Sequence, residues 1–417
     1  MSQVLSSFIS VRAAIAVLFA LTYIGLAVGY VPGLKLNRTG IAFLGAILAI
    51  ILSRLPTSTV VGFVNWPTIL LLFGFFVISA QLRLSGFFDM IARSISSRLD
   101  EPFRFLLVMM LATAGLSAFL NHDIVCYVFT PVIGAALIRR QLNPVPYLIG
   151  LAVASNIGAA ATVVGNPQDM MIAQLAGIDF GGYFLWSVPP VLLALAAAIG
   201  IIWMLSRHHL KLVAATGSDL PSSAVPYNRA HTIKGLLILG LVIGFFFAGL
   251  PMEMVALSAA GIHIASARFK TEELLGLVDW QILVMFMSLF VVNGVFQDTG
   301  YGNQVTRWLS ASGINLQSSF QLTIVTAGLS NLLSNSAAVM LLAKIVNLSL
   351  PHVAYVLALA NSFGGCLIII GSVSNIILVQ TAREQGIKIS FWEFARMGVP
   401  VTLAALACLL AWTWITG

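Results

Sequence analysis

The sequence predicts an all-α polytopic membrane protein with two inverted-topology repeats, each of five spans plus a re-entrant helical hairpin and a broken helix. Three observations support this fold class. Hydrophobic residues make up 59% of the 417 residues, charged residues only 8%, and the mean hydropathy is +1.00, whereas soluble domains carry about 25% charged residues. Apolar runs long enough for membrane helices recur along the chain. Finally, the two halves of the chain carry the same sequence of motifs.

The first repeat is predicted over residues 1–205. Its elements in order are three scaffold spans, an amphipathic stretch suited to the membrane interface, a hairpin, a broken helix and a last span: 12–30, 39–54, 66–82, 84–98, 104–140, 145–178 and 183–205. The polar stretch 206–232 is then predicted to be a cytoplasmic linker.

The second repeat, residues 233–417, restarts the pattern. Its scaffold covers 233–313, as three spans and a second amphipathic stretch. The predicted elements in order are 233–250, 253–267, 280–296, 300–313, then a hairpin at 317–350, a broken helix at 352–385 and a span at 391–414.

Two pairs of polar intramembrane segments show the repeat directly. Residues 115–123 (GLSAFLNHD) match 328–336 (GLSNLLSNS), and residues 151–169 match 357–375. The second pair aligns Gly158 with Gly364, Gly165 with Gly371, and Asp169 with Asn375. A duplicated apolar segment that glycine or proline interrupts is the sequence indication of a transporter binding site.

The charge distribution predicts the topology. If both hairpins are re-entrant, each half crosses the membrane five times, and the odd number inverts the second half. Seventeen of the 21 Lys and Arg residues then share one side, as the positive-inside rule requires. Both termini are therefore expected on the non-cytoplasmic face of a bacterial-type inner membrane. Hairpin arms that cross fully would give the same charge pattern, so the argument for re-entrance is the polar tips, which belong at mid-membrane.

Of the fourteen acidic residues, only Asp123 and Asp169 fall well inside apolar segments. An ionised carboxylate at the bilayer centre costs about 2.5–3.5 kcal/mol even on insertion scales. We therefore expect both to serve transport, and the alternative is that they cap broken helices. His122, next to Asp123, could relay a proton or simply form a hydrogen bond at the hairpin tip.

The helix breaks are the other candidate part of the site. Gly165, Asn166 and Pro167 interrupt one helix, and Gly371 and Ser372 interrupt its counterpart. Unwound backbone offers carbonyl groups to a cation, and half-helix N-termini offer N–H groups to an anion; a simple kink is the alternative. Neutral hydrogen-bonding residues surround both breaks: Ser155, Asn156, Thr162, Asn361, Ser362, Ser374 and Asn375.

At these residues the chain resembles the ion transporter superfamily, which includes arsenite-efflux permeases, sodium/proton antiporters and divalent anion/sodium symporters. The family's Ser-Asn-Thr hairpin tips correspond here to Asn121-His122-Asp123 and Ser334-Asn335-Ser336. Its Gly-x-Pro-x-Asn turn corresponds to residues 165–169 and, more loosely, to 371–375. The resemblance implies an elevator-type motion of hairpins and broken helices against a scaffold, often in a homodimer.

The sequence and the resemblance together predict an ion-coupled secondary transporter of a small anion or oxyacid, with arsenite or antimonite efflux favoured. No arginine is predicted at membrane depth, which argues against a tightly held dianion. Dicarboxylate or sulfate uptake, coupled to sodium or protons, is the alternative, and cation/proton antiport is another. One half-site would use Asn121, Asp123, Asn166 and Asp169; the other would use Ser334, Asn335, Ser336, Ser374 and Asn375.

The remaining expectations concern ions and partners. H⁺ or Na⁺ would be the coupling ion, with sodium near Ser334, Asn335, Ser336 and Ser374, and no tightly bound cofactor is expected. The basic residues lie in loops, so the partners are membrane lipid and the small substrate, with no nucleic acid. The chain has no P-loop, so ATP-driven transport would need a separate ATPase subunit. Two other classes of protein are alternatives. One is an intramembrane enzyme that uses Asp123 and Asp169, but the chain lacks the signature motifs of such enzymes. The other is a passive channel.

Overall fold

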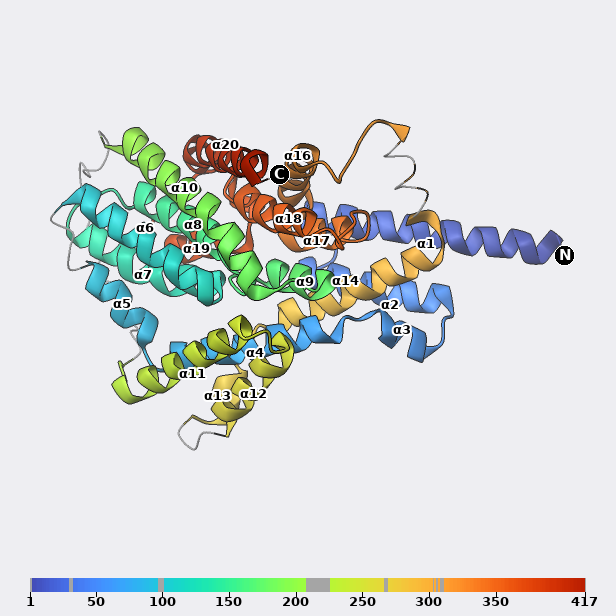
Figure 1. Cartoon of the computed structure of the whole chain (residues 1–417), viewed down its shortest axis with the longest axis horizontal. Coiled ribbons are helices and arrows are strands. Elements are labelled where there is room, and N and C mark those ends of the chain that lie inside the picture. The colour runs from blue at the N-terminus through green and yellow to red at the C-terminus, as the bar shows by residue number, and fades with distance from the viewer. Residues whose placement is uncertain are drawn as a thin grey trace.

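The computed structural model describes residues 2–29, 33–96, 101–207, 226–265, 269–302, 304, 307 and 311–416, and all secondary-structure elements within them are helices (Figure 1). Eight of these helices are long and apolar enough to cross a membrane. The predicted class, an all-α polytopic membrane protein, is confirmed. The inverted orientation of the two repeats and the placement of the termini stay predictions.

The described residues of the first half form ten helices. They are α1 (Ser2–Val28), α2 (Arg38–Ser53), α3 (Thr57–Phe63), α4 (Trp66–Leu84), α5 (Phe87–Ser96), α6 (Pro102–Phe119), α7 (His122–Arg139), α8 (Pro144–Ala159), α9 (Pro167–Ala176) and α10 (Phe180–Ser206). Most of the predicted linker, residues 208–225, lies outside the described residues.

The second half repeats this order. Its helices are α11 (Arg229–Phe247), α12 (Met252–Ile264), α13 (Thr271–Leu275), α14 (Trp280–Asp298), α16 (Ser319–Leu333), α17 (Asn335–Leu342), α18 (Pro351–Gly364), the short 3₁₀ helix η1 (Ile369–Gly371), α19 (Val373–Glu384) and α20 (Phe391–Thr416). Much of the predicted amphipathic stretch 300–313 lies outside the described residues.

The two hairpins differ in length. The arms of the first, α6 and α7, have 18 residues each, which gives about 27 Å of helix. The second hairpin has arms of 15 and 8 residues, α16 and α17. The first pair of arms is thus long enough to cross a bilayer core of about 30 Å nearly completely, so re-entrance stays a prediction.

Helix packing follows the same scheme in both halves. In the scaffold α2 packs along α14, and α4 packs along α12. Within each half α6 packs on α8 and α16 on α18, while α7 contacts α19 and α9 contacts α17 across the halves. Helices α10 and α20 pack on each other (Figure 1). This exchange of partners is what an internal two-fold relation between the halves produces.

Two aligned glycines permit close contacts between helices. A Cβ atom at Gly158 of α8 would collide with the backbone of Ala114 on α6. Likewise, a Cβ at Gly364 of α18 would lie 2.9 Å from the Cα of Ala327 on α16. Small residues let helix backbones approach in membranes, where packing replaces the hydrophobic effect. The glycines that align in sequence therefore hold each hairpin against its broken helix.

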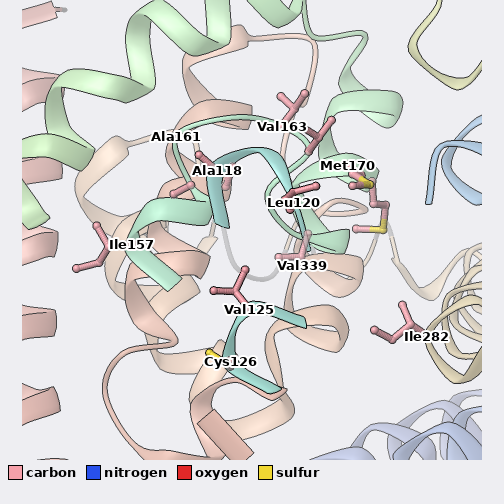
Figure 2. Close-up of a cluster of buried hydrophobic side chains, with 14 of the residues drawn as sticks. Ala118, Leu120, Val125, Cys126, Ile157, Ala161, Val163, Met170, Ile282 and Val339 are labelled. Atoms are coloured by element: carbon pink, nitrogen blue, oxygen red, sulfur yellow. The ribbon is translucent and has the colours of Figure 1, made fainter. Parts of the chain in front are cut away.

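Buried apolar side chains surround the turns where these helices meet. Figure 2 shows Leu120 and Val125 of the first hairpin near Met170 of α9 and Val339 of α17, with Ile282 of α14 at the edge of the cluster. All five side chains are at most 8% exposed. Any polar group placed here lies in an apolar interior, where it must find a partner.

Candidate functional site

Four helices begin at the centre of the protein. They are α7, α9, α17 and α19, with first residues His122, Pro167, Asn335 and Val373. The Nδ1 atom of His122 lies 3.3 Å from the Gly165 carbonyl oxygen, and the Gln168 amide donates to the Ser336 hydroxyl at 2.7 Å. The starts of α7, α9 and α17 are thus in direct contact. Each helix N-terminus carries a partial positive charge.

The start of α9 holds the more deeply buried acid. Asn166 caps the helix: its Oδ1 accepts from the backbone N–H of Asp169 at 2.8 Å, and its Nδ2 donates to Asp169 Oδ2 at 2.6 Å. The same Nδ2 donates to the Ser362 hydroxyl of α18 at 3.0 Å, and that hydroxyl lies 3.4 Å from Asp169 Oδ2. Asp169 is only 1% exposed. Repeat 1 therefore supplies the acid, and repeat 2 supplies one of the side chains that contact it, Ser362.

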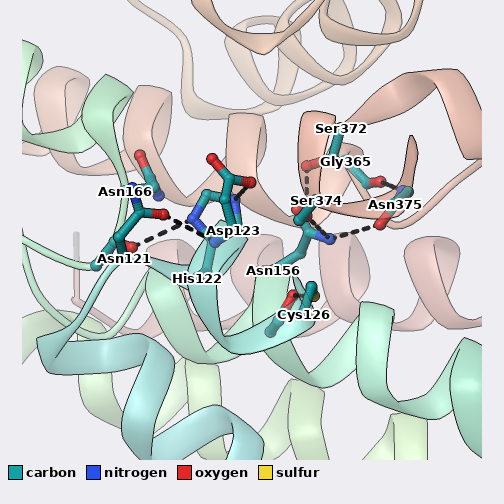
Figure 3. A network of polar contacts seen from close by, with 12 residues as sticks. Asn121, His122, Asp123, Cys126, Asn156, Asn166, Gly365, Ser372, Ser374 and Asn375 are labelled. Atoms are coloured by element: carbon teal, nitrogen blue, oxygen red, sulfur yellow. Dashed lines mark hydrogen bonds and ion pairs between the residues drawn. The ribbon is translucent and has the colours of Figure 1, made fainter. Parts of the chain in front are cut away.

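The start of α19 has the mirrored arrangement (Figure 3). The Asn156 amide, on α8, donates to Asn375 Oδ1 at 2.9 Å and to the Ser374 hydroxyl at 3.3 Å. The Asn375 amide in turn donates to the carbonyl groups of Gly365 and Ile368 at 2.7 and 3.1 Å. In the alignment of the halves, Asn375 corresponds to Asp169 and Asn156 to Ser362. The two sites therefore share one plan, but only one has a carboxylate at this position.

The first hairpin tip places an imidazole beside the second acid. Asn121 caps α7 by accepting from the Asp123 backbone N–H at 2.8 Å. His122 Nε2 lies 3.5 Å from Asp123 Oδ1, the one ion pair of the site within the described part of the chain. A carbonyl oxygen only accepts, so the contact of His122 with Gly165 requires a proton on Nδ1. Any further proton can then lie between Nε2 and Oδ1.

The second hairpin tip has a strained backbone. Ser334 adopts φ 90° and ψ 152°, a region that almost only glycine visits and that costs a residue with a side chain about 1–3 kcal/mol. Beside it, Asn335 Nδ2 and Asn156 Oδ1 would each lie 3.0 Å from a Cβ at Gly365. Gly365 therefore allows the Asn335 side chain of α17 to approach the end of α18. Strain of this kind persists where the surrounding structure enforces a functional geometry.

All of the sequence-predicted site residues are buried, and hydrogen bonds join them both within each repeat and across the repeats. The expected half-sites, each drawn from one repeat, stay a prediction. Asp169 is bonded to Ser362, and Asn375 to Asn156. No described hydrogen bond joins Asp123 to Asp169. The bonds between the repeats have a physical reason. Helix α9 of the first half packs against α17 and α18 of the second, and α19 of the second half packs against α7 and α8 of the first.

The other predicted residues hold the backbone around the site. The Ser155 hydroxyl accepts from the thiol of Cys126 at 3.1 Å, and the hydroxyls of Ser372 and Ser374 are 2.8 Å apart. Gly371 adjoins the side chain of Asn331, and only the absence of a Cβ makes room for it. Thr162, also noted beside the break, donates to the Ala118 carbonyl of the first hairpin.

Several buried polar atoms at the site have no hydrogen-bond partner in the protein. They are Asp123 Oδ1, Asp169 Oδ1, Asn331 Oδ1, Asn335 Oδ1 and both amide atoms of Asn361. A buried polar atom without a partner costs about 1–3 kcal/mol. Oxygens of this kind are the groups that a proton, a cation or a hydroxylated substrate binds.

Residues that the sequence-based set of site residues missed are Gln168, Asn331 and Tyr127. Gln168 aligns with Ser374, so the repeat itself could have identified it. Asn331 donates to the Gly364 carbonyl at 2.8 Å. Tyr127, one turn beyond Asp123, lies under the guanidinium of Arg83 from α4, 4.5 Å from its ring centroid. Nothing in the local sequence indicates that last contact, because α4 and α7 meet only in the tertiary structure.

Metal ligands are not grouped here: in the described ranges no three His, Cys, Asp or Glu residues are placed to share an ion. Sodium near Ser334, Asn335, Ser336 and Ser374 stays a prediction. The donors there are hydroxyl and amide oxygens, which suit a hard monovalent cation better than a transition metal.

The helical membrane fold, with two helical hairpins and two interrupted helices around a buried polar site, is that of a secondary transporter rather than an enzyme. The sequence profile of the citrate transporter family (CitMHS) matches residues 16–357. The chain belongs to this family.

Individual relatives agree with that assignment. An uncharacterized transporter of Mycobacterium tuberculosis is 30% identical over 376 residues, which covers 84% of this chain and 86% of the relative. The silicon efflux transporter LSI3 of Oryza sativa is 24% identical and covers 90% and 92%. The crystal structure of the YdaH transporter of Alcanivorax borkumensis superposes with a TM-score of 0.62 at 15% identity, covering 98% of both chains, and shows a likeness in fold alone.

Proposed function

We propose that this protein is a proton-coupled secondary transporter of a small, weakly acidic oxyacid, with efflux of arsenite or antimonite as the leading function. The meeting of the starts of α7, α9 and α17, with the start of α19 bonded to Asn156 of α8, carries this proposal. Such N-termini bind oxygen atoms of anions and oxyacids through free N–H groups.

The four N-termini divide into two kinds. The first turns of α7 and α9 contain Asp123 and Asp169, whereas those of α17 and α19 contain only neutral side chains such as Ser336 and Ser374. An acid in the first turn cancels the positive end of its helix. Substrate oxygens therefore belong at α17 and α19, and the coupling proton belongs at the two carboxylates.

The chemistry of the side chains favours an uncharged or weakly charged substrate. Among the described residues, the only basic side chain paired with a site acid is His122. A dicarboxylate is usually bound by arginine, because the guanidinium matches a carboxylate with two hydrogen bonds. Arsenous acid needs only hydroxyl and amide partners. The relative named for silicon efflux supports the same choice, since silicic acid is also a small uncharged oxyacid.

Uptake of citrate-like or sulfate-like anions is the second candidate. The name of the family favours it, and the N-termini of α17 and α19 could replace an arginine. In this case sodium at Ser334, Asn335, Ser336 and Ser374 would be the coupling ion. Cation/proton antiport through Asp123 and Asp169 is the third candidate.

The motion we propose is of the elevator type. Helices α6–α9 and α16–α19 would move together against the scaffold α1–α4 and α11–α14, in a homodimer that the scaffold holds. A separate ATPase subunit, if one exists, would add a second energy source. The motion and the homodimer follow from the resemblance to the ion transporter superfamily, whereas the ATPase subunit follows from the absence of a P-loop in the sequence.

Transport into proteoliposomes tests the function. We expect a pH gradient to drive arsenite, antimonite or silicic acid, and Asp169→Asn to abolish this driven flux. Asp298→Asn is the matched control, because Asp298 is an exposed acid at the end of α14. Transport of citrate or sulfate under a sodium gradient would refute the oxyacid proposal. Unchanged proton-driven flux in both Asp123→Asn and Asp169→Asn would refute the coupling role.

A further inference from the structure

A cavity of about 300 Å³ lies between the end of α9 and the turn that joins α11 to α12. Its rim includes the exposed residues Gly177, Gly249 and Leu250, so it opens to the surface. By the predicted topology this surface is the membrane face opposite the basic loops. The cavity thus lies between the broken helix of repeat 1 and the scaffold of repeat 2.

The wall of this α9–α12 cavity carries two carboxylates. Glu253, in the first turn of α12, accepts from the Gln174 amide of α9 at 3.2 Å. Asp179 caps α10 by accepting from the Gly182 backbone N–H at 2.6 Å. No lysine or arginine is among the residues that line the cavity. The carboxylates of Asp179, from repeat 1, and Glu253, from the scaffold of repeat 2, therefore give the cavity a negative potential.

The floor of the cavity adjoins Asp169. Ala173 lines the cavity and is 1% exposed. It follows Asp169 by four residues, so both lie on one face of α9, about 6 Å apart along the helix axis. Asp169 Oδ1 is the buried oxygen without a protein partner. Along α9, one turn of helix lies between Ala173, which lines the cavity, and Asp169.

The other titratable groups near Asp169 are phenols and one imidazole. Tyr183 of α10 is within electrostatic reach of Asp169, and its hydroxyl donates to the Ala160 carbonyl at 3.0 Å. Tyr355, on the neighbouring α18, packs edge-on against Tyr183 with ring centroids 5.2 Å apart. The imidazole is that of His122, whose Nδ1 contacts the carbonyl oxygen of Gly165 before the start of α9. None of the described ion pairs involves Asp169.

We propose that the α9–α12 cavity is the proton-collecting mouth for Asp169. Its volume is about ten times the roughly 30 Å³ that a liquid water molecule occupies, so it accommodates a water chain. The negative wall concentrates hydronium, as charged clefts with low-dielectric walls do. Hydronium then transfers a proton to Asp169: one O–H bond breaks, leaving water, and one forms on Oδ1. This inference rests on the coupling role of Asp169 in the proposed function.

The test uses purified full-length protein in proteoliposomes, with the pH stepped on the face of the cavity. The double variant Asp179→Asn/Glu253→Gln should lower the proton-driven rate about tenfold at low ionic strength, the lower end of electrostatic focusing. The loss should shrink at high salt, because salt screens exposed charges. Substrate KM should not change. Asp298→Asn, which removes an exposed acid outside the cavity, should behave as wild type.

Two further variants separate this role from a structural one. Glu253→Gln alone spares the cap of α10 and should give part of the loss. Ala173→Leu fills the floor and should slow proton-driven transport at every salt concentration, while substrate counterflow, which needs no net proton entry, persists.

Three results would overturn the inference. If the double variant and Ala173→Leu both transport at the wild-type rate while Asp169→Asn loses proton coupling, the cavity does not collect protons for Asp169. The proposed function would then still stand. The double variant could also lose proton-driven transport equally at all salt concentrations and for pH steps on either face of the membrane. That result would show that Asp179 and Glu253 have a structural role. Intact coupling in Asp169→Asn would refute the proposed function first.

Discussion

Replacing Asn156 by alanine tests whether the bond between the repeats positions the second helix break. The Asn156 amide is 2% exposed and donates to Asn375 Oδ1, to Ser374 and to the Ala152 carbonyl. The carbonyl groups of Gly365 and Ile368 still hold Asn375 through its own amide. In the variant, Asn375 keeps these two bonds, but its Oδ1 loses the Asn156 donor that fixes its position.

The structure sets the size of the effect. A hydrogen bond between membrane helices contributes about 0.6 kcal/mol on average and up to about 1.7 kcal/mol. Leaving the buried acceptor unpaired costs about 1–3 kcal/mol. We expect Asn156→Ala to lower the free energy of unfolding by about 1–3 kcal/mol, and to lower transport about tenfold or more because small displacements of binding groups are costly.

The matched control is Asn293→Ala. Asn293 of α14 is also 2% exposed, and its amide donates to the Tyr23 hydroxyl and the Leu289 carbonyl, both at 2.8 Å. Both variants should lose similar stability in reversible unfolding by SDS, but only Asn156→Ala should lose transport in proteoliposomes. If Asn293→Ala lost as much transport, or if Asn156→Ala transported normally at the same stability loss, the positioning role would be wrong.

Three further predictions concern packing and strain. Gly158→Ala should destabilise the protein by about 1–3 kcal/mol because its methyl group collides with the backbone of α6. The control Gly115→Ala, whose methyl group meets nothing within 4 Å, should change stability by less than about 0.5 kcal/mol. Unfolding in SDS measures both variants, and equal losses of stability would contradict the packing of Gly158 on α6. Ser334→Gly should raise stability by about 1 kcal/mol by relieving a φ of 90°, measured as a higher unfolding midpoint; a lower midpoint would mean that the hydroxyl matters more than the backbone. Tyr127→Leu should lose the cation–π contact with α4, about 0.5–2 kcal/mol, while Tyr127→Phe keeps it; the test is thermal stability in detergent, and identical behaviour of the two variants would refute the contact.

Much of the candidate site could be predicted from the sequence because its signals are local. Glycine and proline inside an apolar run interrupt a helix wherever the run folds, so the breaks at Gly165–Pro167 and Gly371–Ser372 are visible in the sequence. The cost of burying charge marked Asp123 and Asp169. The internal repeat then indicated which residues have equivalent positions.

The sequence by itself thus determined the membrane class, the order of helices and the identity of most polar groups at the centre. Only the tertiary structure decided their partners: Asp169 with Ser362, Asn156 with Asn375, and Gln168 with Ser336. The physical reason is that each of these bonds joins residues at least 168 positions apart, and contacts of that range depend on how whole helices pack. Hydropathy and turn signals, which act within a few residues, carry no information about that packing.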